Sequence, residues 1–466
     1  MKRKTITILG GGFSGSMLAV QLAHLPGGPF ACDIHLVEPR PIAGPGLAYT
    51  ARRPEYLLNV RSPQLSAFPE NPGHFVEWLQ TNHTPACEQE FCSRETYGHY
   101  IQELVTTIIS HSPINGIRVT VHHTAATAAT LAPDGKSAVL ELANGTRLSS
   151  DYVVLALGNF PPLPPTRPAD GYSNHPGFHG NPWAQGALRS IGLDDSVLLI
   201  GSGLTAVDVL LGLRADGHRA PITVVSGHGR WPSTHGPAEP TYPSFYTTEL
   251  QELKTVGEVV AAIRRRVRTA ATQGIDWRPV LDSLRPDLGN IWANWPLPEQ
   301  ARFLRHVSSL WTTIRHRSPP QNAAIIEQLM AAGQVQVYQG RVQHLVSQGP
   351  ELAVHIRRKR STAVLTAQHV VSCTGPLLDY TRIQDPLVLS LREAGQLVPD
   401  ALRLGIVTDE HGALLTADGS VSPVYFTLGP SRRPAYFEST AVPELRQQAV
   451  ALAQLLGSKV AGQPRV

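Results

Sequence analysis

The feature that most restricts the fold of this chain is a glycine-rich turn close to its N-terminus. The turn satisfies the pattern G-x-G-x-x-G and consists of Gly10, Gly11, Gly12, Phe13, Ser14 and Gly15. It follows the apolar run 5–9, which predicts a strand, and precedes a segment, 13–24, that predicts a helix. In such a unit Gly10 permits the tight turn, Gly12 lets the backbone approach a pyrophosphate, and Gly15 lets the helix pack on the strand. The motif therefore predicts a parallel α/β domain that binds a dinucleotide.

An acidic residue follows at the distance that this motif requires. A second predicted strand covers 33–37, and Glu38 comes directly after it. A carboxylate about 20 residues past the turn accepts hydrogen bonds from ribose hydroxyls. The predicted strand, the predicted helix and the acid together strengthen the prediction that the first glycine turn binds a dinucleotide.

A second glycine turn lies in the middle of the chain, between a predicted strand at 197–200 and a predicted helix at 205–213. Its residues are Gly201, Ser202, Gly203, Leu204, Thr205 and Ala206. Alanine at the last position is tolerated by the motif. Two such units in one chain are typical of enzymes that pass hydride from a nicotinamide to a flavin, whereas a simple dehydrogenase needs one. We therefore expect FAD at the first turn and a nicotinamide dinucleotide at the second.

The residues after the next strand, 222–225, favour NADPH over NADH as that second ligand. No acid stands there to repel a 2′-phosphate, and Ser226, His228 and Arg230 are available to bind it. The alternative for Arg230 is a solvated loop charge.

The order of predicted elements gives an α/β fold class with two Rossmann-like dinucleotide-binding domains, antiparallel meanders and a helical insertion. We expect an FAD domain built from 1–162 and 371–466 and an NAD(P) domain at 163–370 that carries the helical insertion at about 247–333. The alternating stretches 118–148 and 335–356 predict the antiparallel meanders.

Composition excludes several other classes of protein. Hydrophobic residues make up 42% and charged residues 16% of the chain, as in globular proteins. The formal net charge of +4 is too balanced to predict nucleic acid binding. The first apolar run is too short for a secretory signal and no window could span a membrane, so we expect a cytoplasmic protein without a membrane partner. The four cysteines form no C-x-x-C pair, which disfavours a disulfide framework, a metal site and a thiol–disulfide reductase.

Several further motifs resemble one family of flavoproteins. They are Gly46-Leu47-Ala48-Tyr49, Leu57-Leu58-Asn59-Val60, the run from Phe91 to Tyr100, Leu155-Ala156-Leu157-Gly158, Arg302 to His306, Arg315-His316-Arg317 and the run from Phe437 to Gln448. The chain resembles the two-dinucleotide-domain flavoproteins that include N-hydroxylating and Baeyer–Villiger monooxygenases. It is most similar to the bacterial FAD/NAD(P)-binding family that includes flavin-dependent urate hydroxylases. This resemblance implies that NADPH reduces FAD and that the reduced flavin uses O₂ to oxygenate a small molecule.

The resemblance also assigns candidate site residues. It implies that Asn59 and Arg61 lie beside the flavin ring, where Arg61 replaces a small residue common in relatives and could pair with an anionic substrate such as urate. Arg94 could hold the FAD pyrophosphate or form a structural ion pair. Three glycines at the ends of predicted strands are expected to contact cofactor, namely Gly158, Gly375 and Gly429. Because Pro430 stands where relatives often have an acid, a contact at Gly429 must come from backbone.

Some alternatives stay open on the sequence. Trp292, Trp295 and Trp311 lie near the basic residues at 305–306 and 315–317, and could form either an aromatic, basic pocket or ordinary core. For the protein as a whole, the alternatives to a monooxygenase are a flavin reductase or oxidase with another acceptor, and a non-enzymatic dinucleotide-binding redox sensor. Steady NADPH turnover separates an enzyme from a sensor.

Overall fold

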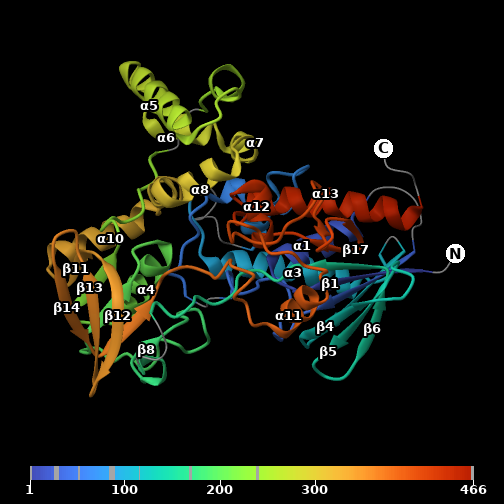
Figure 1. Cartoon of the computed structure of the whole chain (residues 1–466), viewed down its shortest axis with the longest axis horizontal. Helices are drawn as coiled ribbons and strands as arrows, with labels where there is room; N and C mark the ends of the chain where they lie inside the picture. Colours follow the sequence, from blue (N-terminus) through green and yellow to red (C-terminus); the bar gives the residue numbers. More distant parts are fainter. Residues whose placement is uncertain are drawn as a thin grey trace.

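The computed structural model describes residues 3–25, 31–50, 53–82, 90–114, 116–166, 171–237 and 241–462. These residues form two parallel sheets with helices against them and two small antiparallel sheets (Figure 1). This arrangement confirms the predicted α/β fold class.

The first sheet combines strands from both ends of the chain. It has six strands in the order β16-β17-β7-β1-β2-β3, and all neighbours are parallel except β16 and β17. The strands are β1 (Lys4–Leu9), β2 (Cys32–Val37), β3 (Ile117–His122), β7 (Tyr152–Leu155), β16 (Ala413–Leu415) and β17 (Val421–Thr427). Helix α1 (Phe13–Ala23) is buried along its whole length and packs against α3 (Arg94–Ser110) and α13 (Val442–Ala461). We call this sheet with its helices the first domain.

The second sheet comes from the middle of the chain. Its five strands are all parallel and have the order β11-β10-β9-β15-β8. They are β8 (Phe178–His179), β9 (Val197–Ile200), β10 (Ile222–Ser226), β11 (Val335–Gln339) and β15 (His369–Ser372). Helices α4 (Leu204–Ala215) and α10 (Pro320–Ala331) pack on one another beside this sheet. We call this unit the second domain. Because β15 pairs with β9 up to Ser372, we propose the domain boundary after this residue rather than at 371.

Two strands that the sequence analysis assigned to antiparallel meanders are edge strands of the parallel sheets. β3 pairs with β2, and β11 pairs with β10, both in parallel register. An edge strand with one exposed face shows the same alternation of apolar and polar residues as an antiparallel strand, which explains the wrong prediction. The true meanders are β4 (Ala126–Leu131), β5 (Ala138–Leu142) and β6 (Arg147–Ser150), and β12 (Arg341–Gln348), β13 (Glu351–Arg357) and β14 (Thr362–Ala367).

A helical segment connects β10 to β11, as expected. It contains α5 (Val256–Thr272), α6 (Trp277–Asp282), α7 (Leu288–Asn294), α8 (Leu297–His306) and α9 (Ser308–Arg315) before α10. Thr255 begins α5 with a reciprocal capping box that includes Glu258. In Figure 1, α5 and α6 project away from both parallel sheets. The remaining helices are α2 (His74–Thr81), α11 (Pro386–Glu393) and α12 (Arg433–Tyr436).

Candidate functional site

The first glycine turn has the geometry that its sequence predicts. Gly10 has φ +109°, and a Cβ there would lie 2.3 Å from the carbonyl oxygen of Ala156. The amide of Gly10 donates to the carbonyl of Val37 at 2.8 Å. A Cβ at Gly15 would lie 1.9 Å from the carbonyl oxygen of Gly10. Neighbouring backbone therefore excludes side chains at both positions.

Gly12 and Gly46 form a narrow backbone cradle at the start of α1. Gly12 is the N-cap of the helix. A Cβ on Gly12 would lie 3.3 Å from the Cα of Gly46, and one on Gly46 would lie 2.9 Å from the Cα of Gly12. Backbone N–H groups and the helix dipole at this position favour an anion. The cradle fits the pyrophosphate of FAD because a side chain at either glycine would fill it.

The two residues after Gly12 are buried. The ring of Phe13 packs edge-on against Tyr49, with ring centroids 5.9 Å apart. Ser14 lies beneath Gly429, whose added Cβ would lie 2.8 Å from the Ser14 Oγ. The side chains of Phe13 and Ser14 therefore pack in the interior at the start of α1. The predicted contacts of these two residues with the cofactor would have to come from their backbone groups.

Glu38 is fully buried at the end of β2 and accepts three kinds of hydrogen bond. Its Oε2 accepts from the amide of Gly11 at 2.8 Å. The Arg40 guanidinium donates to Oε1 at 2.7 Å and to Oε2 at 2.9 Å, and the Arg40 amide also donates to Oε1. Each carboxylate oxygen has two acceptor positions, so a ribose hydroxyl would compete with Arg40 for them. Arg40 is a site residue that the sequence analysis missed.

Gly429 closes the first site from the C-terminal side of the chain. It follows β17 with φ +91°, and its amide donates to the Gln448 Oε1 at 2.9 Å. The Ser439 hydroxyl donates to the Gly429 carbonyl at 2.6 Å, and the Gln448 Nε2 donates to the Ser439 Oγ at 2.8 Å. This buried network positions the backbone around Gly429 without an acid. Ser439 and Gln448 lie in the C-terminal motif, but their contact with Gly429 was not predicted.

Gly158 and Gly375 lie at the two points where the chain crosses between domains. Both have positive φ, and a Cβ on either would meet nothing within 4 Å in the described parts of the chain. Phe160 and Leu377 form an antiparallel bridge between the crossing segments, with the Leu377 amide donating to the Phe160 carbonyl at 3.1 Å. The two glycines therefore lie beside this bridge, outside the glycine turns themselves.

The second glycine turn repeats the first with one difference. A Cβ on Gly201 would lie 2.4 Å from the carbonyl oxygen of Cys373, and the Gly201 amide donates to Val225 at 2.8 Å. A Cβ on Gly203, the N-cap of α4, would meet no atom of the described residues within 4 Å. Leu204 and Thr205, the first residues of α4, are half-buried. No neighbour forms a cradle here as Gly46 does at Gly12, but the backbone N–H groups and the dipole at the start of α4 favour an anion such as the pyrophosphate of a dinucleotide.

Ser226 is the equivalent of Glu38 in the second domain. Each residue directly follows the strand residue, Val225 or Val37, whose carbonyl accepts a hydrogen bond from the amide of the first glycine of the turn. The Ser226 Oγ accepts from the Gly229 amide at 3.0 Å and lies 2.9 Å from the Ser202 Oγ. The Arg230 side chain is exposed, and its amide donates to the His228 Nδ1 at 3.1 Å. Burial and the neighbouring Arg230 lower the pKa of His228, so the imidazole is neutral at pH 7. The positive charge of this loop thus comes from Arg230.

Arg94 forms an ion pair between the domains. Its Nη2 lies 3.1 Å from the Oδ2 of Asp208 on α4, and its guanidinium lies 5.5 Å from the centroid of the Trp183 ring. Burial raises the pKa of Asp208 to about 6, and Arg94 opposes this rise. Of the two roles expected for Arg94, the structure contains the structural ion pair.

Asn59 and Arg61 hold a loop of the second domain. The Nε2 of His235 donates to the carbonyl of Asn59 at 3.0 Å. The Arg61 Nη2 donates to the carbonyl of Gly236 at 3.0 Å, and its guanidinium lies over the Phe91 ring, 4.8 Å from the centroid. Burial lowers the pKa of His235 to about 4, so its ring is neutral at pH 7. The sequence analysis missed His235, and the catalytic roles of Asn59 and Arg61 stay predictions.

The tryptophans of the helical segment are core residues. Trp292 and Trp295 are buried and pack with Phe303 and Phe437. Trp311 is partly buried, and its Nε1 donates to Glu438 at 2.9 Å. The structure therefore favours ordinary packing over an aromatic pocket. Among the described residues, no group of three His, Cys, Asp or Glu side chains could hold a metal ion, and no described helix is long and apolar enough to cross a membrane.

Comparison with known proteins supports a flavoprotein fold. Residues 7–160 match a family model described as FAD-NAD(P)-binding. The fold is similar to an ornithine N-hydroxylase from Kutzneria sp. 744, described as a complex with reduced FAD, NADP⁺ and L-ornithine, with a TM-score of 0.66 and 13% identity over 98% of this chain and 100% of that chain. It is also similar to L-lysine 6-monooxygenase from Pseudomonas syringae, with a TM-score of 0.63 and 15% identity over 99% of each chain.

A Lactococcus lactis thioredoxin reductase shares the fold at a TM-score of 0.52 and 10% identity, over 99% of this chain and 100% of that chain. No curated protein matches the sequence. At these identities the structural likeness shows the fold alone, which is that of flavoproteins with two dinucleotide-binding domains.

Proposed function

We propose that this protein is an FAD-dependent, NADPH-using monooxygenase that hydroxylates a small molecule. The observation that carries the proposal is the pair of glycine turns, each at the carboxyl end of a central strand of a parallel sheet, and each followed by a helix whose N-terminus can bind a pyrophosphate. The similar structures include proteins named as ornithine and lysine monooxygenases. Bound FAD would accept hydride from NADPH and then react with O₂.

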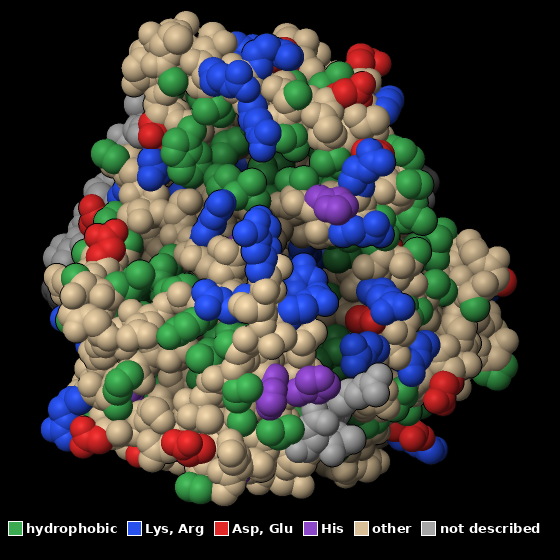
Figure 2. All heavy atoms as spheres, turned by 60° about the vertical axis from the view of Figure 1, so that its left-hand side comes forward, with side chains coloured by type: hydrophobic (Ala, Val, Ile, Leu, Met, Phe, Trp, Pro, Cys, Tyr) green, Lys and Arg blue, Asp and Glu red, His purple; other side chains and the backbone are tan. Residues whose placement is uncertain are grey.

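The residues of this chain would hold the cofactors and organise the space between them. The cradle of Gly12 and Gly46, with Glu38 and the backbone at Gly429, would bind FAD. The second turn, with Ser226 and Arg230, would bind NADPH. Figure 2 shows Lys and Arg side chains gathered toward the middle of one face, with Asp and Glu mainly toward its edges, a charge distribution that favours an anionic coenzyme.

The contacts of Asn59 and Arg61 would close the passage between the two cofactors. His235 and Gly236 bring the second domain against the segment that holds Asn59 and Arg61. Exclusion of water from this region would protect the reactive flavin. A urate-like anion is the substrate chemistry that Arg61 suits best. Its pairing with such an anion requires the guanidinium to share or release both the Gly236 carbonyl and the Glu90 carboxylate, whose Oε2 lies 3.6 Å from the Arg61 Nη1.

The cysteines give no support to a thiol–disulfide reductase on the same fold. The described cysteines, Cys32, Cys92 and Cys373, are all buried. Burial raises the pKa of Cys373, and the nearby Asp208 raises it further, which makes this thiol unreactive. Because these described cysteines offer no reactive thiol to take electrons, O₂ is the acceptor that we propose. An oxidase or reductase with another acceptor, and a redox sensor, are the alternatives that the next experiment separates.

The test is incorporation of oxygen from ¹⁸O₂ into a product. The flavin-loaded protein is incubated with NADPH and each of a set of small substrates that includes urate and primary amines. We expect one of them to accelerate NADPH consumption and to gain one ¹⁸O atom, as seen by mass spectrometry. Turnover of NADPH that yields only hydrogen peroxide with every substrate would indicate an oxidase or a reductase. Absence of turnover with the flavin bound would indicate a sensor.

A further inference from the structure

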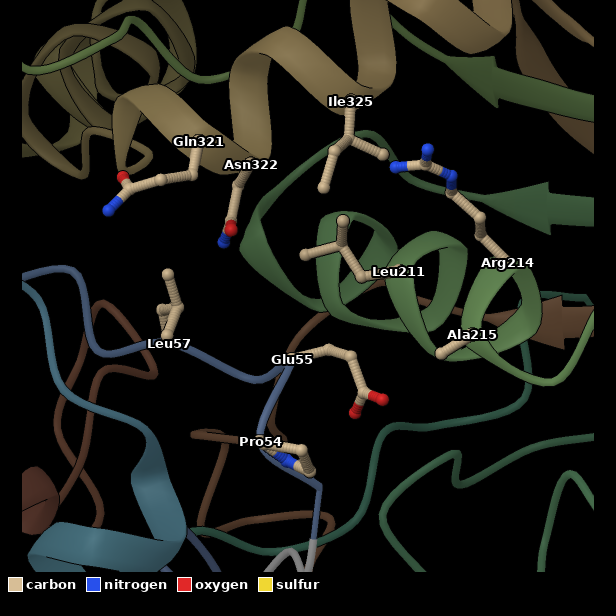
Figure 3. A pocket seen from close by; sticks show the side chains of 9 residues that line it. All are labelled: Pro54, Glu55, Leu57, Leu211, Arg214, Ala215, Gln321, Asn322 and Ile325. Atoms are coloured by element: carbon tan, nitrogen blue, oxygen red, sulfur yellow. The ribbon is translucent and has the colours of Figure 1, made fainter.

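A cavity of about 320 Å³ lies between the two domains (Figure 3). The first domain contributes the segment with Glu55 and Leu57, and the second contributes Leu211 and Arg214 of α4 and Ile325 of α10. Leu211 and Arg214 are 8 to 11 residues beyond Gly203, which corresponds to about 12–16 Å along the helix. The cavity is therefore separate from the proposed NADPH pyrophosphate site.

The walls of this cavity combine aliphatic surface with one unsatisfied acid. Leu57, Leu211 and Ile325 supply the aliphatic surface. The Oε2 of Glu55 is buried and has no hydrogen-bond partner among the residues that the structure describes. A buried carboxylate oxygen without a donor costs free energy, which a ligand N–H group would recover. Arg214 also lines the cavity, but its side chain is exposed, so water can solvate its charge.

We propose that this cavity binds a small primary amine in its alkylammonium form. The ammonium group would donate a charge-assisted hydrogen bond to Glu55, and a short aliphatic chain would cover Leu57, Leu211 and Ile325. The unsatisfied acid favours a cation over an anion, because the cation of the pocket, Arg214, is the group already solvated. This site goes beyond the proposed oxygenation reaction and does not depend on it.

An amine in this cavity would act on the contact between the domains. The residues on either side of Glu55 already join them. Arg53 donates to the carbonyl of Gly212 at 3.2 Å and to Asp216 at 2.7 Å, and the Tyr56 hydroxyl packs against Gly212, where an added Cβ would lie 2.6 Å from the Tyr56 oxygen. A ligand that touches both sides would stabilise this arrangement, so the site has the position of an effector site.

Isothermal titration calorimetry on the flavin-loaded protein tests the proposal without NADPH or turnover. The probes are n-butylammonium chloride, 1-butanol and sodium butyrate. We expect one butylammonium per chain and binding of butanol and butyrate at least about tenfold weaker, because they cannot donate a charged hydrogen bond to Glu55. No saturable binding of butylammonium, or equal binding of butanol, would overturn the proposal.

Three variants locate the binding. Glu55→Gln should weaken butylammonium at least about tenfold. Arg214→Gln should bind it equally well or more tightly, since a cation is removed from the wall. Glu393→Gln, an exposed acid on α11, is the matched control and should not change binding. Unchanged affinity in Glu55→Gln, or a loss confined to Arg214→Gln, would overturn the assignment. If Glu55→Gln does not fold, the comparison of the three probes on the unmodified protein decides.

Discussion

The two domains use the same turn in different surroundings. In both domains a backbone carbonyl oxygen leaves no room for a side chain at the first glycine. An added Cβ would lie 2.3 Å from the Ala156 oxygen in the first domain and 2.4 Å from the Cys373 oxygen in the second. The third position of the motif differs, because Gly12 faces Gly46 whereas a Cβ on Gly203 would meet no described residue within 4 Å. We infer that the first turn is covered to retain a resident cofactor, and that the second is open to a coenzyme that enters and leaves.

The residues Glu38 and Ser226, which have equivalent positions at the second strand of each unit, show the same contrast between a closed and an open site. Glu38 is fully buried and bonded to Gly11 and Arg40, so it belongs to a closed site. Ser226 carries no charge, and the cation of its loop, Arg230, is exposed. A buried acid suits ribose hydroxyls, and an exposed cation suits a phosphate that arrives from solvent.

The helices of the two turns also have different tasks. Helix α1 is buried along its whole length within the first domain. Helix α4 instead meets the first domain through Asp208, Gly212 and Asp216, which contact Arg94 and Arg53. The second domain is therefore attached through the same helix that starts at its cofactor turn.

The largest effect that we predict separates the two turns. Gly12→Val should abolish flavin binding, because the side chain would occupy the pyrophosphate cradle beside Gly46. Loss of two charged hydrogen bonds of about 1.5–3 kcal/mol each weakens binding by about 100-fold or more. The ratio of flavin absorbance to protein absorbance in the purified variant measures this.

Gly203→Val is the matched variant in the second domain. It should fold and remain yellow, because its Cβ has open space, but it should lose affinity for NADP⁺ in a titration. Loss of flavin from Gly203→Val, or a fully yellow Gly12→Val, would break the comparison between the two turns.

Much of this fold could be predicted because its signals are local. The turns at Gly10 and Gly201, their helices and the helical segment each depend on short sequence patterns. The edge strands β3 and β11 were assigned wrongly. An alternation of apolar and polar residues indicates that one face of a strand is exposed, but it does not indicate the direction of the neighbouring strand. The same error occurred at the same place in both domains, which reflects their shared architecture.

The site was predictable only where one motif contains it. Gly12, Glu38, Gly203 and Ser226 follow from spacing along the chain. The pairing of Arg94 with Asp208 and of Asn59 with His235 joins residues more than 100 positions apart, and no local pattern encodes such contacts. A charged residue in a family motif therefore indicated that Arg94 matters without indicating its partner.

The second prediction concerns the pH dependence of stability at helix α4. Burial raises the pKa of Asp208 from its ordinary value of 3.8 to about 6. The folded protein thus binds this proton more tightly than the unfolded chain, so the contribution of Asp208 is most favourable below pH 4 and falls as pH rises through 6. The shift corresponds to about 3 kcal/mol at most. The stability of Asp208→Asn should not show this decrease with rising pH.

The midpoint of thermal unfolding, Tm, measured between pH 4 and 8 for the flavin-loaded protein checks this prediction. The Tm of Asp208→Asn relative to that of the unmodified protein should rise between pH 4 and about 6 and then stay constant. Asp216→Asn is the control, because its ion pair with Arg53 is solvent-exposed and contributes little. Its pH profile should run parallel to that of the unmodified protein. Parallel profiles for Asp208→Asn as well would show that Asp208 does not titrate in this range.

The smallest effect concerns coenzyme choice at the open turn. Arg230→Ala should raise the KM for NADPH by about tenfold and leave the KM for NADH nearly unchanged, because a charged hydrogen bond to the 2′-phosphate contributes about 1.5 kcal/mol at an exposed position. Arg264→Ala, an exposed arginine on α5, is the control and should change neither constant. Steady-state kinetics with both coenzymes provide the measurement. Equal increases for NADPH and NADH would mean that Arg230 binds a group that the two coenzymes share. The open turn would then bind its coenzyme through the start of α4, as the closed turn does through the start of α1. In that case the replacement of Glu38 by Ser226 would not explain a preference for NADPH.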